Sequence, residues 1–234
     1  MDFELSPLYI NFIKKKMMKI IDIQSAKKRS MFRIQFDSDY ILEICKETLL
    51  TFQLKAGMEI DESTVEEVRK FDINSRLKEQ AFRYLKQRAH SSNELKRKLI
   101  RKGFEEEDVE PFIQTLLEQN ILNDRDFLSM FIHDRVEFSR KGSYFIINEL
   151  KQKGFPEGEI IPVLRQFLTP ERELDQAIKL AQKKWDFYRN KEKAIRIQKV
   201  YQFLGQKGYP INIIKNAIEH IIEERMEGED FNEY

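Results

Sequence analysis

The sequence predicts a mainly α-helical protein, with three tandem three-helix repeats of the helix-turn-helix kind in an elongated array behind a small β-containing N-terminal module. Two observations predict this fold class. The 234 residues include only 8 glycines and 6 prolines, and 35% of them are charged, a composition that favours helices over a β-sandwich or barrel. In addition, a Lys-Gly-aromatic triplet recurs at intervals of about 50 residues, at Gly103, Gly154 and Gly208.

Alignment of the chain on these glycines brings apolar residues into register on both sides. The aligned positions before each glycine hold Leu95, Ile146 and Val200, then Leu99, Leu150 and Leu204; those after it hold Val109, Ile160 and Ile214, then Ile113, Leu164 and Ile218, and then Leu116, Phe167 and Ile221. Such spacing places the side chains on one face of a helix. The glycine suits the left-handed position that ends the first helix of each pair.

A further helix precedes each pair, and capping residues indicate where helices begin. Ser91 and Glu94 form a capping box, Asn123 or Asp124 can cap the next repeat, and Thr169 followed by Pro170 can start the third. We therefore expect an N-terminal extension at residues 1–75, repeats at 76–125, 126–169 and 170–222, and an acidic tail at 223–234. This tail either solvates the terminus or competes with nucleic acid for basic surface.

The N-terminal extension has a different pattern. Short runs in which apolar residues often alternate predict two or three antiparallel strands, at Met18 to Ile23, Met31 to Phe36 and Tyr40 to Ile44. Beyond these runs we expect a helix over Thr48 to Leu54, a turn over Lys55 to Asp61 and a charged helix over Glu62 to Phe71. Cys45, the only cysteine, is expected in the core rather than as a reactive thiol.

Composition and motifs exclude several classes of protein. The longest uncharged stretch, Leu5 to Ile13, is too short to cross a bilayer, and acidic residues before it reverse the charge order of a secretory signal, so we expect a cytoplasmic protein with no membrane partner. Phosphate loops, dinucleotide fingerprints and the common hydrolase and zinc motifs are absent from the sequence. We therefore expect no enzyme activity, no cofactor and no metal site, since His90, His133 and His220 have no cysteine partners.

Basic residues gather before and around the glycines. The candidate partner- or nucleic-acid-binding residues are Arg88, Lys96, Arg97, Arg101, Lys102, Arg135, Arg140, Lys141, Lys151 and Lys153. These charges either solvate exposed helix faces or form one long basic surface across the repeats. Such a surface would suit a phosphate backbone or an acidic protein groove.

Three segments together resemble the RecX family of recombinase regulators. They are AFRYLKQRAHSSNELKRKLIRKGF from Ala81 to Phe104, NILNDRDF from Asn120 to Phe127, and Arg140-Lys-Gly with ELKQKGF from Glu149 to Phe155. The match covers residues 76–168, and the third repeat is a looser match. Ser143 stands where the family commonly has proline, and Met17 is where such a protein is expected to begin.

The resemblance implies a monomeric, non-enzymatic regulator that binds RecA and lodges in the groove of the RecA filament on single-stranded DNA. It would limit filament growth, ATP hydrolysis and recombination, with weak direct binding to DNA. Two alternatives come from the residues themselves. Helix-turn-helix units with basic helices can enter a major groove without RecA, and an adaptor with no link to nucleic acid would explain the repeats but not the basic residues.

Overall fold

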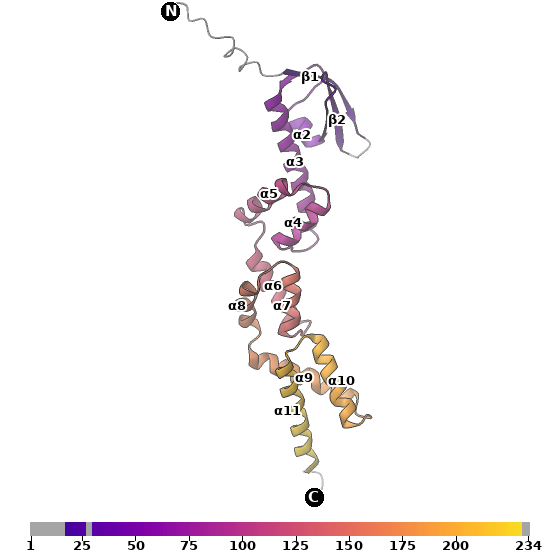
Figure 1. Ribbon diagram of the computed structural model, residues 1–234, viewed down its shortest axis with the longest axis vertical. Helices are drawn as coiled ribbons and strands as arrows, with labels where there is room; N and C mark the ends of the chain where they lie inside the picture. Colours follow the sequence, from indigo (N-terminus) through magenta and orange to yellow (C-terminus); the bar gives the residue numbers. More distant parts are fainter. Residues whose placement is uncertain (1–16, 27–29, 231–234) are drawn as a thin grey trace, which may run out of the picture. The chain divides into compact units, whose positions relative to one another are not determined.

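The computed structural model describes residues 17–26 and 30–230, and side chains as far as Arg225. The described Cα atoms form two compact units, one of the residues up to Arg88 with Leu95–Glu118 and the other of Ala89–Glu94 with the residues from Gln119 onward. Four strands and the helices that follow them make a mainly α-helical chain (Figure 1). Within the described residues, every helix is too short or too polar to span a bilayer. The expected start at Met17 concerns residues 1–16, which lie outside the described residues.

The N-terminal module is an antiparallel sheet in the order β3-β2-β1-β4. Its strands are β1 (Met17–Ser25), β2 (Met31–Phe36), β3 (Ile41–Cys45) and β4 (Glu59–Asp61). The three predicted strands are confirmed. Alternation points every second side chain of β2 and β3 inward, where Ile34, Phe36 and Ile44 are at most 1% exposed. The predicted turn at Lys55 to Asp61 ends in β4, because its last residues pair with Met17–Lys19.

Two helices of the first unit differ in extent from the sequence-based prediction. Helix α2 covers Lys46–Thr51, and α3 runs without interruption over Glu62–Leu85 and packs against both α2 and β3 (Figure 1). No glycine or proline interrupts α3, and its inward face is buried at both ends, at Val68 and Ala81. Cys45 is half-buried rather than fully in the core, with its Sγ 3.2 Å from Thr48 Oγ1.

The remaining helices repeat the predicted pattern. Repeat 1 continues with α4 (Ser92–Arg101) and α5 (Glu106–Glu118); repeat 2 has α6 (Asp124–Glu137), α7 (Ser143–Gln152) and α8 (Glu157–Phe167); repeat 3 has α9 (Pro170–Phe187), α10 (Lys193–Lys207) and α11 (Ile211–Asp230). The six aligned positions before the glycines are all fully buried. The sequence alignment therefore identified the inward face of α4, α7 and α10.

Caps and turns also follow the sequence. Asn123 Oδ1 accepts a hydrogen bond from Asp126 N–H at 3.1 Å, and Thr169 Oγ1 accepts one from Arg172 N–H at 3.2 Å. In the predicted capping box, Ser91 Oγ accepts from Glu94 N–H at 3.2 Å. Gly103, Gly154 and Gly208 all have positive φ, between 82° and 99°. The three glycines thus end α4, α7 and α10 as predicted.

The acidic tail coincides with the end of α11. Glu224 accepts a hydrogen bond from Gln182 at 2.9 Å, and the neighbouring Arg225 pairs with Asp186 on α9. These contacts fix the first part of the tail against repeat 3. Glu233 lies outside the described residues.

Candidate functional site

At least four of the ten candidate basic residues are held in ion pairs among the described residues. Lys96 pairs with Glu106 and Glu110, Arg135 with Glu149 and Asp134, Lys151 with Glu157, and Lys153 with Glu94. The hydrogen bonds to Glu110 and then Glu106 raise the pKa of Lys96, and the bond to Glu149 raises the pKa of Arg135. These four side chains stabilise contacts between helices, whatever else they bind.

The Arg135–Glu149 pair is the most fully connected of these contacts. Arg135 donates to both carboxylate oxygens of Glu149 at 2.8 Å, and its guanidinium lies 4.4 Å from the centre of the Phe131 ring. The bond from Arg135 lowers the pKa of Glu149. A bidentate pair between α6 and α7 of this kind fixes their orientation.

The basic face of repeat 1 lies on α4 and the turn after it. Lys98, Arg101 and Lys102 line a shallow hollow of about 290 Å³ with Tyr84 of α3. Lys98 Nζ lies 4.8 Å from the centre of the Tyr84 ring, a cation–π distance that orients the lysine. Arg97, Arg101 and Lys102 are exposed. The structure therefore brings three basic side chains and one aromatic ring together on this face.

A second group of cations surrounds the loop between α6 and α7. Lys207 Nζ donates to Ser139 O at 3.1 Å, and Tyr209 Oη donates to Arg140 O at 3.2 Å. Lys141 Nζ lies 3.8 Å from the centre of the Phe145 ring. Burial, and then the charges of Lys141 and Arg140, lower the pKa of Lys207. Hydrogen bonds to backbone carbonyl oxygens thus hold the positive charges of Arg140, Lys141 and Lys207 close together.

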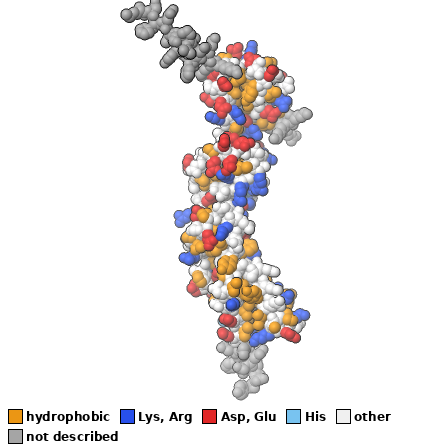
Figure 2. Space-filling model, in the orientation of Figure 1, with side chains coloured by type: hydrophobic (Ala, Val, Ile, Leu, Met, Phe, Trp, Pro, Cys, Tyr) orange, Lys and Arg blue, Asp and Glu red, His pale blue; other side chains and the backbone are white. Residues whose placement is uncertain are grey.

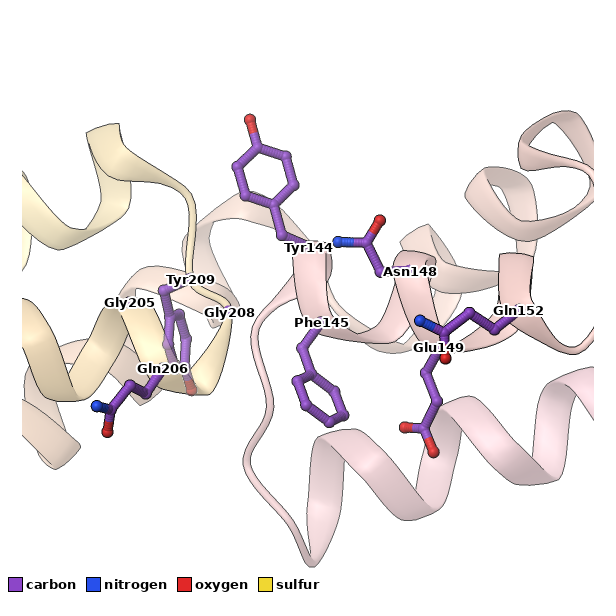
Figure 3. A pocket seen from close by; sticks show the side chains of 9 residues that line it. All are labelled: Tyr144, Phe145, Asn148, Glu149, Gln152, Gly205, Gln206, Gly208 and Tyr209. Atoms are coloured by element: carbon purple, nitrogen blue, oxygen red, sulfur yellow. The ribbon is translucent and has the colours of Figure 1, made fainter.

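A cleft of about 340 Å³ lies beside this loop, between α7 and the turn that follows α10 (Figure 3). Tyr144 and Phe145 at the start of α7 line the cleft together with Gly208 and Tyr209, and Asn148 and Gln152 follow along the same helix. The side chains of Tyr144 and Phe145 point in opposite directions (Figure 3). The lining is aromatic and amide-rich. Its one acidic side chain, Glu149, is neutralised by Arg135.

A cluster in repeat 3 was not among the candidate residues. Lys184 Nζ lies 5.3, 5.2 and 5.0 Å from the ring centres of Phe187, Tyr188 and Phe203. Phe187 is 75% exposed. The run Trp185–Tyr188 in the sequence could have indicated this cluster. Phe187 and Tyr188 are adjacent at a helix end, so they point in different directions and cannot both face the core.

A metal site in a protein gathers several His, Cys, Asp or Glu side chains around the ion. The described residues hold no group of three or more His, Cys, Asp and Glu side chains placed to bind a metal ion. Buried carboxylates have structural partners: Asp72 accepts from Thr48 Oγ1, and Glu173 accepts from Ser143 N–H. On the face drawn in Figure 2, basic side chains are interspersed with acidic ones.

Comparison with known proteins gives consistent matches along most of the chain. Family models for the first, second and third three-helix domains of RecX match residues 78–116, 123–160 and 171–218. A regulatory protein RecX of Clostridium perfringens is 31% identical over 87% of this chain and 96% of its own length. One of Limosilactobacillus reuteri is 28% identical over 88% of this chain and 78% of its own length.

Two solved structures share the fold. A crystal structure of regulatory protein RecX covers 85% of this chain and 97% of its own, with 29% identity and a TM-score of 0.61. That of RecX from Lactobacillus salivarius covers 64% of this chain and 96% of its own, with 23% identity and a TM-score of 0.58.

Proposed function

Because the chain belongs to the RecX family, we propose that it regulates the recombinase RecA. In this proposal the chain acts as a monomer in the cytoplasm, without catalysis. It binds RecA and the RecA filament on single-stranded DNA and lowers recombinase and ATPase activity. The observation that carries the proposal is the match of all three RecX domains in order along one chain.

The basic surfaces support a partner with distributed negative charge. Each of the two groups of cations has two members that form no ion pair within the described part of the chain, Arg101 and Lys102 in the first and Arg140 and Lys141 in the second. A filament on DNA presents many phosphates and acidic groups along a path, and such charge attracts basic surfaces at a distance. Regulation through the filament therefore requires no cleft for a small substrate.

ATP turnover by RecA on single-stranded DNA tests the proposal. A regulator of the filament should lower turnover at ratios well below one chain per RecA, because one occupied growing end or groove segment affects many subunits. A loss that follows a one-to-one ratio would indicate competition for DNA instead. Unchanged turnover at saturating chain would contradict the proposal.

Binding to naked and RecA-coated strands distinguishes the proposed function from direct DNA binding. Pure backbone binding to a single strand weakens with salt at a log-log slope near about −0.7 per phosphate contacted. We expect weak, salt-sensitive binding to naked DNA and clearly tighter binding to the coated strand. Equal affinity for both would favour a helix-turn-helix protein that acts without RecA.

Replacement of the four cations by serine tests where the partner binds. We expect affinity for the filament to fall by about tenfold when Arg101, Lys102, Arg140 and Lys141 are replaced, because rim charges act mainly on association. A matched control replaces four exposed lysines of α3 and the module, at Lys55, Lys70, Lys78 and Lys86. Equal losses for the two variants would show that net charge, and not this surface, determines binding.

A further inference from the structure

In each repeat, an acidic side chain accepts a hydrogen bond from the backbone at the start of an earlier helix, and we call each such contact a joint. In joint B, repeat 2 holds the start of α4: Asp124 Oδ1 accepts from Ser92 N–H at 2.7 Å. In joint C, repeat 3 holds the start of α7: Glu173 Oε1 accepts from Ser143 N–H at 2.6 Å. In both joints an acidic side chain of the later repeat caps the earlier helix, where a negative charge is favoured.

A Lys-Gly-aromatic turn closes each of these two joints. A Cβ atom on Gly154 would lie 2.4 Å from Asn93 Nδ2, and one on Gly208 would lie 2.4 Å from Phe145 Cβ, so both turns are seated directly on the helix start. In joint B the turn also supplies Lys153, whose Nζ lies 2.7 Å from Glu94 Oε1. The aromatic residues of the two turns, Phe155 and Tyr209, are 6% and 2% exposed.

The N-terminal module and repeat 1 form a third joint, joint A, that is only half made. Asp72 of α3 accepts from Cys45 N–H at 2.6 Å and from Thr48 Oγ1 at 3.0 Å, so an acidic side chain also holds the start of α2. The bonded N–H here belongs to the residue before the helix, whereas in joints B and C it belongs to the first helical residue. The turn of repeat 1 is not seated, because a Cβ atom on Gly103 would meet nothing within 4 Å. Phe104 is accordingly only half-buried.

A cleft of about 650 Å³ occupies the place of the missing contact. Its walls include Lys46 and Glu47 at the start of α2 and Lys102 and Phe104 of the turn. Glu47 stands two residues beyond the capped N–H of its joint, as Glu94 does in joint B. Within the described part of the chain, neither Glu47 nor Lys102 has an ion-pair partner.

We propose that joint A also adopts a closed form, in which the Lys102–Phe104 turn seats on the start of α2 and Lys102 pairs with Glu47. Closure would bury the exposed part of the Phe104 ring and expel water from the cleft, which strengthens the new ion pair. In the open form Arg76 covers that ring, 5.6 Å from its centre, and Glu79 and Arg83 line the same cleft. The proposal holds whether or not the chain regulates RecA.

Zero-length cross-linking of the full chain with a water-soluble carbodiimide tests the closed form. The carboxylate first adds to the carbodiimide and is activated as an acyl ester. The amine of a lysine in contact then attacks the acyl carbon, so that an amide bond forms and the reagent leaves as a urea. The Glu94–Lys153 pair of joint B serves as the internal standard. If at least a fifth of the molecules are closed, the Glu47–Lys102 link should form within about fivefold of that standard, as measured by mass spectrometry of peptides.

Two variants make the result specific. Lys102→Arg keeps the charge but cannot form the amide, so the Glu47–Lys102 link should disappear. Gly103→Asn tolerates the left-handed backbone but adds a side chain where the turn must seat, so the link should fall at least about threefold while Glu94–Lys153 stays constant. The closed form is refuted if Glu47 links to Lys102 no more than to the exposed Lys78, or if Gly103→Asn leaves the link unchanged.

Discussion

Replacement of three glycines by alanine, one at a time, separates the cost of backbone strain from the cost of steric clash in the stability of the chain. Gly103 has a φ of 99° and open space around it, so Gly103→Ala should cost only the strain of a left-handed residue, about 1–2 kcal/mol. Gly142 has a φ of −76°, which alanine adopts freely, but its Cβ would lie 2.4 Å from Gly208 O. Gly142→Ala should therefore cost about 2–3 kcal/mol through overpacking alone.

Gly208→Ala combines both penalties. Its φ is 82°, and the new Cβ would lie 2.4 Å from Phe145 Cβ and 2.6 Å from Phe145 N. We expect a cost of about 3–5 kcal/mol, near the sum of the other two. The cost should rise from Gly103→Ala through Gly142→Ala to Gly208→Ala, because all three changes add the same methyl group to different surroundings.

The free energy of local opening is measured by hydrogen exchange at buried amides near each site. Ile146 and Leu204 report on joint C, and Leu99 reports on repeat 1, so each loss is assigned to its own part of the chain. Urea unfolding followed by circular dichroism checks the total. A cost for Gly208→Ala no larger than that for Gly103→Ala, or a neutral Gly142→Ala, would show that steric clash does not add to backbone strain at these positions.

Two further predictions concern the ion pairs and the alkaline limit. Lys153→Met should cost about 2 kcal/mol in urea unfolding, because Glu94, with 13% of its side chain exposed, loses its ion pair with Lys153. Lys151→Met, which breaks an exposed pair, should cost less than about 0.5 kcal/mol. Equal costs for the two variants would contradict this assignment. Burial raises the pKa of Tyr209 above its ordinary value of about 10, so the unfolded chain loses this proton first and the parent loses stability as pH rises beyond about 10. Tyr209→Phe should remove that part of the loss, so the melting temperature of this variant should fall less steeply between pH 9 and 11. At pH 8 the variant should be about 1 kcal/mol less stable than the parent, because the hydrogen bond to Arg140 O is missing.

The repeat pattern predicted the helices and their buried faces well, for a physical reason. Each glycine with positive φ fixes where one helix ends, so the apolar residues on either side fall into a single register. Caps such as Asn123 and Thr169 are equally local, since their hydrogen bonds span only a few residues. Information of this kind is contained in short stretches of sequence.

Contacts between distant residues were not predictable in the same way. The pairing of Lys153 with Glu94 joins residues 59 positions apart, and nothing near either residue indicates it. The same holds for Asp72, whose acceptor role depends on the N–H of Cys45, 27 positions away. The sequence therefore identified the basic residues but could not show which of them hold helices together.

The three lysines before the glycines show why equivalent positions need not share a function. Lys153 is half-buried against Glu94, Lys207 donates to Ser139 O beside two other cations, and Lys102 is exposed at the edge of an open cleft. A change at Lys153 alters the stability of a joint, so its effect on a partner cannot be read as lost binding. A change at Lys102 breaks no ion pair of the described chain. Mutational mapping of a partner surface should therefore begin with Lys102, and any effect of Lys153 should be interpreted only after its stability has been measured.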